Sequence, residues 1–127
     1  MNNSMSLKGK VAIVTGGTKG IGKGIVDVLQ SRGARVVMCA RKSVRGKALC
    51  VEADVSNRND VQRLIDTTLK KYKRIDILVN NAGIYPGVEL KDMTGQQWQQ
   101  MMDINLKGIF NCTQAVLPAM MKQKRGK

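Results

Sequence analysis

The 127-residue sequence contains no histidine, and only 3% of its residues are aromatic. The lack of an imidazole excludes a histidine general base, and the scarcity of aromatic rings means that aliphatic side chains and eight methionines must fill the interior. No run reaches the roughly 18 apolar residues of a membrane-spanning helix, and residues 1–10 lack the apolar centre of a signal peptide. A chain of this length suits one domain with a modest core.

The three cysteines, Cys39, Cys50 and Cys112, lie within apolar runs, without paired spacing. Disulfide frameworks and zinc sites depend on such pairing, usually with histidine in the case of zinc. We therefore interpret the cysteines as reduced core residues of a cytoplasmic protein and expect no metal site.

Acidic residues are also few, since 9 Asp and Glu against 22 Lys and Arg give a net charge of +13. A basic surface attracts nucleic-acid phosphates. Here the cations are scattered through periodic segments, aromatic rings for base stacking are scarce, and the only dense basic run is residues 122–127. We interpret most of the charge as a solvated face and expect neither nucleic acid nor a membrane as a partner.

Residues 11–22, V-A-I-V-T-G-G-T-K-G-I-G, combine a short β-branched run with a glycine-rich turn and the start of a helical pattern. Glycines at 16, 20 and 22 let backbone N–H groups approach a pyrophosphate, and the helix N-terminus adds unpaired donors. The alternative is a plain tight turn, because the spacing is G-x-x-x-G-x-G and not G-x-G-x-x-G.

Four short apolar runs alternate with segments of helical periodicity. This alternation predicts parallel β-α units and an α/β fold with a doubly wound sheet. The expected strands are residues 10–15, 34–40, 48–53 and 75–79. The expected helices are residues 20–32 closed by Gly33, a helix capped by Ser56 that buries Val61, Leu64, Ile65 and Leu69, and a long segment from Thr94 to about 121 that Pro118 bends or tightens.

Four motifs stand in order along the chain: T-G-x-x-x-G-I-G at 15–22, A-D-V at 53–55, N-N-A-G at 80–83, and Asn105 in D-I-N-L-K-G. In these motifs the sequence resembles the N-terminal half of the classical short-chain dehydrogenase/reductase family, from Leu7 to Lys127. The resemblance implies a dinucleotide-binding Rossmann-type sheet over residues 1–127. Its first four strands would be ordered 3-2-1-4, and its C-terminal strands and helices would be missing.

The resemblance implies a role for the first two motifs. The turn from Gly16 through Gly20 to Gly22 would carry the cofactor pyrophosphate, with Thr18 and Ile21 nearby. Asp54 would accept a hydrogen bond from the adenine amino group, and Val55 would pack against the adenine. From the residues alone, Asp54 can also be a turn residue that caps a helix.

The resemblance also implies roles for the last two motifs. Asn81, Ala82 and Gly83 would line the wall beside the cofactor riboses, and Asn80 is interpreted as a residue that ties neighbouring strands. Asn105 would help to hold a proton-relay water and is the one catalytic residue of the family that the sequence contains.

The second expected strand ends at Arg41 and Lys42, without the acid that binds the ribose 2′-hydroxyl of NAD. Arg can grip a 2′-phosphate through two hydrogen bonds, and Lys19 in the glycine turn adds a second point of positive charge. We therefore predict NADP(H) as the cofactor in preference to NAD(H). The alternative is a solvated Arg41.

The family's catalytic Tyr, the Lys four residues after it and the Ser have no counterpart in these residues. Neither Tyr72 nor Tyr85 has a lysine four positions later. We therefore expect no turnover from the sequence as it stands. The resemblance implies a homo-oligomer, a dimer or tetramer, for the full-length protein. The apolar side of the long helix suits such an interface, although a plain core contact explains it almost as well.

Only six residues, K-S-V-R-G-K, separate Arg41 from Ala48, whereas neighbouring parallel strands are usually joined by a dozen or more. We hypothesise that residues are missing near 43–46 and after 127, and we expect a spatial gap at the first position. The leading function is an NADP-dependent oxidoreductase acting on a small alcohol or carbonyl substrate. The alternatives are a truncated, inactive dinucleotide-binding protein and a basic protein that interacts with RNA.

Overall fold

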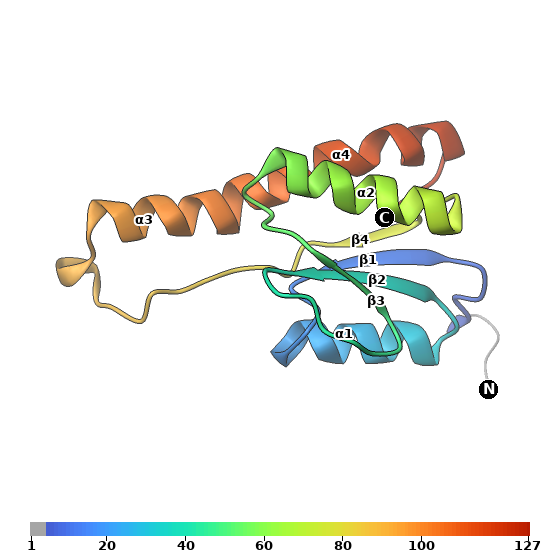
Figure 1. Ribbon diagram of the computed structural model, residues 1–127, viewed down its shortest axis with the longest axis horizontal. Helices are drawn as coiled ribbons and strands as arrows, with labels where there is room; N and C mark the ends of the chain where they lie inside the picture. The colour runs from blue at the N-terminus through green and yellow to red at the C-terminus, as the bar shows by residue number, and fades with distance from the viewer. Residues whose placement is uncertain (1–4) are drawn as a thin grey trace.

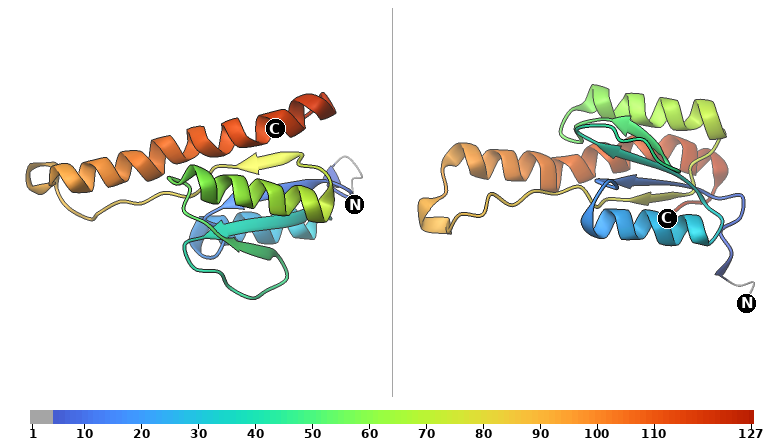
Figure 2. Two further views of the ribbon diagram at one scale, coloured as in Figure 1. Left: turned by 45° about the horizontal axis from the view of Figure 1, so that its top comes forward. Right: turned by 60° about the horizontal axis from the view of Figure 1, so that its bottom comes forward.

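A computed structural model describes residues 5–127, so residues 1–4 of the polar N-terminus lie outside the described residues. Four parallel strands form one sheet in the order β3-β2-β1-β4. Helix α1 covers one face of this sheet, and helices α2 and α4 cover the other (Figures 1 and 2). The Rossmann-type fold and the strand order 3-2-1-4 are confirmed. The strands are β1 Val11–Thr15, β2 Arg35–Ala40, β3 Leu49–Glu52 and β4 Ile77–Val79, and the α-helices are α1 Gly20–Ser31, α2 Arg58–Tyr72, α3 Gly95–Met102 and α4 Gly108–Gln123.

Strand β1 forms the centre of the core, and all five of its residues are buried. Alternate side chains point to opposite faces of a strand. Ile13 therefore packs in the cluster beneath α2 and α4, together with Val37. Ala12 and Val14 pack in the cluster beneath α1. Burial on both faces explains why the strand is an uninterrupted apolar run in the sequence.

Most helix boundaries follow the predicted signals. Gly33 adopts a positive φ of 94° directly after α1, as a residue that ends a helix does. Thr94 caps α3 through a reciprocal pair of bonds with Gln97. The predicted cap of α2 at Ser56 is wrong by one residue, because Asn57 accepts from the first backbone N–H groups of the helix. The hydroxyl of Ser56 instead donates to Asp54 Oδ1 at 2.7 Å.

The predicted long helix consists of α3 and α4, which a π-helical turn at Asp103–Lys107 joins. Figure 2 shows these three segments as one extended rod beside the sheet. Helix α4 continues through Pro118 to Gln123, so its helical hydrogen bonding resumes after the proline. The irregular turn therefore lies before α4, where a π-turn aims side chains differently from the regular helix.

The connection between β2 and β3 is a continuous irregular loop, so the expectation of a spatial gap near residues 43–46 is wrong (Figure 1). The two strands pair in parallel, from Val37 with Leu49 to Ala40 with Glu52. A strand this short spans only about 13 Å, and an extended loop of eight residues reaches about 25 Å. The loop can therefore return to the start of β3 without a helix.

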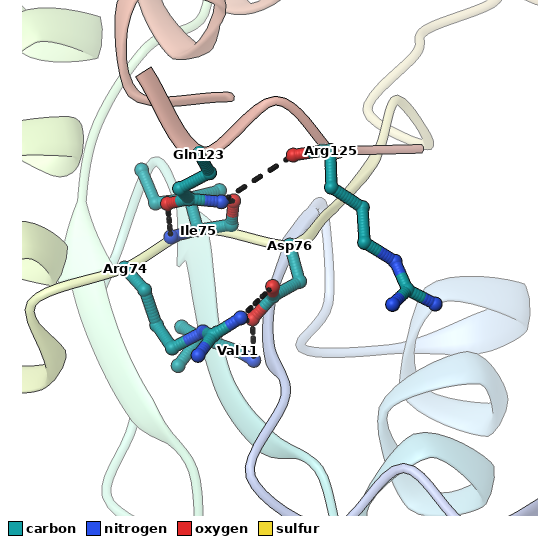
Figure 3. A network of polar contacts seen from close by, with 6 residues as sticks. All are labelled: Val11, Arg74, Ile75, Asp76, Gln123 and Arg125. Atoms are coloured by element: carbon teal, nitrogen blue, oxygen red, sulfur yellow. Dashed lines mark hydrogen bonds and ion pairs between the residues drawn. The ribbon is translucent and has the colours of Figure 1, made fainter. Parts of the chain in front are cut away.

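A network of polar contacts closes the sheet at the start of β1 and β4 (Figure 3). The buried Asp76 carboxylate accepts from the Val11 N–H at 2.9 Å and from Arg74 at 2.6 and 2.8 Å. The bonds from Arg74 come first among the causes that hold the pKa of Asp76 below its ordinary value. The amide of Gln123 bonds both the N–H and the carbonyl of Ile75, so the end of α4 is tied to the start of β4.

We expect Asp76→Asn to lower the free energy of unfolding at pH 7 by roughly 1–3 kcal/mol, because it weakens the acceptor for two charge-assisted bonds. A lowered folded-state pKa gives stability that is present above the unfolded pKa of about 4 and is lost as pH falls through the folded value. The difference between wild type and variant should therefore shrink from pH 7 towards pH 3. Urea unfolding across this range measures it.

The matched control is Asp92→Asn, since Asp92 is exposed and lies in a separate 3₁₀ turn. This variant should follow the wild type at every pH. A difference between wild type and Asp76→Asn that stays constant with pH would contradict the role of the Asp76 charge.

Candidate functional site

A cavity of about 910 Å³ lies at the carboxyl ends of the strands. The glycine turn after β1, the ends of β2 and β3, and the segment after β4 all contribute to its wall. Every residue that the sequence suggested for cofactor binding lines this one cavity. They are Gly16, Thr18, Lys19, Gly20, Ile21, Gly22, Arg41, Lys42, Asp54, Val55, Asn81, Ala82 and Gly83.

The glycine turn has the backbone geometry that an anion site requires. Gly16 and Gly20 have φ values of 66° and 59°, which residues with a Cβ rarely adopt. A Cβ on Gly22 would overlap the carbonyl of Gly16 and the Asn81 amide. Lys19 precedes α1 without a side-chain cap, so the first N–H groups of that helix remain available to an anion.

The end of β1 is tied to the segment after β4 through Thr15 and Asn81. The Thr15 hydroxyl accepts from the N–H groups of Asn81 and Ala82 at 3.0 and 2.9 Å. The Asn81 amide donates to the carbonyls of Thr15 and Gly16 at 3.0 and 3.1 Å. The interpretation of Asn80 as the strand tie is therefore wrong by one residue, since its amide donates instead to Thr113 of α4 at 3.3 Å.

Asp54 has both a structural role and a free oxygen. Its Oδ1 accepts from the N–H and the hydroxyl of Ser56, so Asp54 has the turn role that the sequence suggested as an alternative to adenine binding. Within residues 5–127 its Oδ2 makes no hydrogen bond, and the residue lines the cavity. The backbone N–H of Asp54 donates to the Asp60 carboxylate at 2.9 Å. This bond, together with Arg63, holds the pKa of the Asp60 carboxyl below its ordinary value.

Three cations, Lys19, Arg41 and Lys42, lie exposed on the cavity wall, and none forms an ion pair within the described residues. Glu52 pairs in register with Ala40 at the end of β2, but it does not line the cavity. The end of β2 therefore presents uncompensated positive charge to a bound molecule.

Asn105 does not line the cavity. It lies in the π-helical turn, where its Oδ1 accepts from the Ile84 N–H and its Nδ2 donates to the Ile84 carbonyl, both at 2.7 Å. Both polar atoms of the side chain are therefore used to hold the segment after β4 against the long helix. Ile84 and Ile104 beside it do line the cavity, so the Asn105 side chain acts here as a positioning group.

The cavity also includes residues that the sequence reasoning missed: Cys39, Ala40, Val44, Ala53, Ile84 and Ile104. Thr15 was missed as a tie between strands, although a polar residue at the end of a buried apolar run was a usable signal. Cys39 lines the cavity, and burial raises the pKa of its thiol to about 12. Burial likewise raises the pKa of Cys112 to about 11, so neither thiol is a nucleophile near neutral pH.

The three cysteines are free, with Cys39 and Cys112 buried and Cys50 partly buried. Residues 5–127 contain no group of three potential metal ligands. In the same part of the chain no helix is both long and apolar enough to cross a membrane.

Residues 10–127 match the family model for short chain dehydrogenases. The chain is 42% identical to a 3-oxoacyl-[acyl-carrier-protein] reductase from Synechocystis over 96% of its own length and 55% of the relative's. It is 38% identical to L-fucose dehydrogenase from Bos taurus over 91% of its length and 46% of the relative's.

Solved structures give the same result. The crystal structure of gox2181 matches with a TM-score of 0.92 and 36% identity, over 98% of this chain and 53% of the other. Ligand-free aldohexose dehydrogenase from Thermoplasma acidophilum matches with a TM-score of 0.86 and 33% identity, over 91% of this chain and 46% of the other.

The chain thus spans about half the length of the relatives that it matches. The alignment with the Synechocystis reductase has 135 positions but takes in only 96% of the 127 residues here, so that relative has residues inside the matched region that this chain lacks. The family model covers nearly all of the sequence, and the sheet order agrees with it. The chain belongs to the short-chain dehydrogenase family.

Proposed function

We propose that this chain supplies the cofactor-binding half of an oxidoreductase that transfers a hydride between NADP(H) and an alcohol or carbonyl substrate. The observation that supports this most is the single cavity that brings together the glycine turn, Asp54 and the three unpaired cations. A dinucleotide needs these three features at once, because its pyrophosphate, adenine and ribose ends each require a different partner.

The residues present fit such a cofactor. The N–H groups between Gly16 and Gly22, at the start of α1, would bind the pyrophosphate. The free Oδ2 of Asp54 would accept from the adenine amino group, beside Val55. When bound, the nicotinamide supplies or accepts the hydride.

The preference for NADP(H) rests on charge. A 2′-phosphate is a dianion near neutral pH, and Arg41 can bond two of its oxygens in parallel. Lys42 and Lys19 add charge on the same wall. An acid that would repel this phosphate and bind the 2′-hydroxyl of NAD is lacking from the cavity wall at the end of β2.

We propose that the residues that transfer the proton during the reaction lie outside the 127 residues. The Ser, Tyr and Lys of the family would come from a part of the protein beyond the 127 residues, and the same part would shape the substrate pocket. We also propose that the loop at residues 41–48 is shortened relative to the relatives, in line with their additional aligned residues. Without the remainder, the chain would be an inactive dinucleotide-binding protein.

We further propose a cytoplasmic homo-oligomer that packs through α3, α4 and the turn between them. Several large apolar side chains on this rod are exposed to solvent, and a group of exposed apolar side chains often marks a protein–protein interface. These residues are Trp98, Leu106, Ile109, Phe110, Leu117 and Met121.

Titration calorimetry should show that NADP⁺ binds at least tenfold more tightly than NAD⁺. Arg41→Ala should weaken NADP⁺ binding by about 10- to 100-fold, as expected for lost charged hydrogen bonds, and should leave NAD⁺ binding within about twofold. The matched control is Arg45→Ala, because Arg45 is exposed in the same loop but does not line the cavity. Equal affinities for the two cofactors in the wild type would refute the NADP preference.

Gly22→Ala should weaken binding of both cofactors by at least tenfold, because the new methyl group overlaps the Gly16 carbonyl and displaces the turn. Gly24→Ala on the same helix is the control, since a Cβ there meets open space. Calorimetry with NADP⁺ and NAD⁺ compares the two variants, and circular dichroism verifies that both fold. Wild-type affinity in Gly22→Ala would argue against the glycine turn as the pyrophosphate site.

The oligomer is tested by light scattering after size-exclusion chromatography. We expect the wild-type chain to be at least dimeric and Phe110→Glu to shift it to the monomer, because a carboxylate cannot be buried in an apolar contact without a partner. Val28→Glu replaces an equally exposed apolar residue on α1 and should leave the oligomer intact. A monomeric wild type, or the same shift in both variants, would contradict the proposed interface.

A further inference from the structure

The fold gathers cations at the end of the molecule opposite the cavity. All four strands begin at this end, and helices α1, α2 and α4 finish there, because each helix runs back against the parallel strands. Segments far apart in the sequence therefore contribute to one surface, which we call the basic end. It comprises Lys8, Lys10, Arg32, Arg35, Lys70, Lys71, Lys73, Arg74, Lys122, Lys124, Arg125 and Lys127.

Contacts on both sides of the sheet show that these segments are neighbours. The Leu7 N–H donates to the Arg32 carbonyl at 2.7 Å, and the Arg35 N–H donates to the Lys10 carbonyl at 2.9 Å. The guanidinium of Arg35 lies 5.5 Å from the ring centre of Tyr72, at the end of α2.

The end of the chain joins the same surface. The Lys127 N–H donates to the Asp76 carbonyl at 3.0 Å. Figure 3 shows the Arg125 side chain extending away from the Asp76 and Arg74 pair.

The charge of the basic end is almost uncompensated. Asp76 is the one acid in these segments, and its carboxylate is buried and already bound by Arg74 and Val11. Apart from Arg74, none of the basic residues forms an ion pair within residues 5–127. Eleven of the twelve basic residues are exposed, and Lys10 is half-buried.

Helix dipoles explain only a part of this concentration. Cations in the last turn of a helix are stabilised by its free carbonyls, which accounts for Lys70, Lys71 and Lys122. Lys8, Lys10 and Arg35 instead precede or begin strands, so the dipole of their own element does not account for them. Mutual repulsion of so many like charges costs stability, and a bound polyanion would relieve it.

We propose that the basic end binds the phosphate backbone of a nucleic acid without sequence preference. The cations span the whole end of the domain and include four arginines, which suits a row of phosphates. The Tyr72 ring has the Arg35 and Lys71 cations within 5.5 Å, so it is not free to stack on a base. The binding therefore rests on charge, and it is independent of the proposed oxidoreductase function.

An anionic membrane suits this surface less well. Docking to a bilayer combines cations with apolar side chains that enter the interface. The exposed side chains Trp98, Leu106 and Phe110 lie at and before the start of α4, away from the basic end where α4 finishes. Among the described residues, the exposed apolar side chains at the basic end itself are the methionines Met5, which contacts Arg32, and Met121 near the end of α4, and neither is an aromatic anchor. The sequence led us to expect no nucleic-acid partner because the cations are scattered along the chain, and it is the fold that brings them together.

Fluorescence anisotropy with a labelled, mixed-sequence DNA duplex of about 20 base pairs tests the proposal, at salt concentrations of roughly 50–200 mM. The variant Lys70→Gln/Lys122→Gln removes two cations from the basic end. The control Lys91→Gln/Lys107→Gln removes two exposed cations that lie before the start of α4, away from the basic end, with the same change in net charge. Thermal melting verifies that both variants fold.

The wild type should bind the duplex, with an affinity that falls steeply as salt rises. The basic-end variant should bind at least fivefold more weakly at low salt, and its slope of log affinity against log salt should be smaller by about 2, or roughly 0.9 for each lost phosphate contact. The control should bind within twofold of the wild type. Saturating NADP⁺ should leave the duplex titration unchanged, because the cavity lies at the other end of the sheet.

Equal losses in the two variants would overturn the proposal, since binding would then depend on net charge and not on this surface. Displacement of the duplex by NADP⁺ would overturn it as well, because the phosphates would then occupy the cavity. Binding to phosphatidylserine vesicles without binding to the duplex would show a membrane surface instead. A failure of NADP⁺ to bind would refute the proposed cofactor and leave the duplex result unaffected.

Discussion

All four strands of the sheet run in the same direction, and the position of every residue discussed here depends on that constraint. The carboxyl ends of the strands bring the glycine turn, Asp54 and Asn81 into one cavity, although these residues lie up to 65 positions apart in the chain. The amino ends bring together basic residues from both termini and from the loops between them. One direction therefore creates two ends of different chemistry, an anion cradle with a defined shape and a broad cationic surface.

The cavity depends on a few close contacts around Gly16. The Asn81 side chain donates to the carbonyls of Thr15 and Gly16. Any side chain at position 22 would overlap the Gly16 carbonyl and the Asn81 amide, so this position requires glycine. Burial of β1 on both faces holds the preceding residues in place, so the turn begins from a rigid strand. The adaptable parts are the exposed cations at the end of β2, where long side chains can adjust to a ligand.

The sequence predicted the elements and their order well, because apolar periodicity and glycine positions respond to local geometry. It failed where neighbouring residues offer the same chemistry: Asn57 and not Ser56 caps α2, and Asn81 and not Asn80 ties the strands. The spatial gap expected near residues 43–46 was wrong, because typical crossover lengths do not forbid a short loop between short strands. That residues are missing there stays a prediction. The basic end was not predictable, since it exists only after the strands are aligned.

The two ends of the sheet can act independently because of their separation. A five-residue strand such as β1 spans about 17 Å, whereas the screening length at physiological ionic strength is about 8 Å. The electrostatic potential of a charge at one end is therefore largely screened by salt at the other end, except for the part that acts through the low-dielectric core. Lowering the salt concentration lengthens this range to about 30 Å at 0.01 M, so that an anion at the cavity and a polyanion at the basic end would then repel each other. The high net charge is thus compatible with a selective anion site, because that site responds to its own three cations and not to the sum over the whole chain.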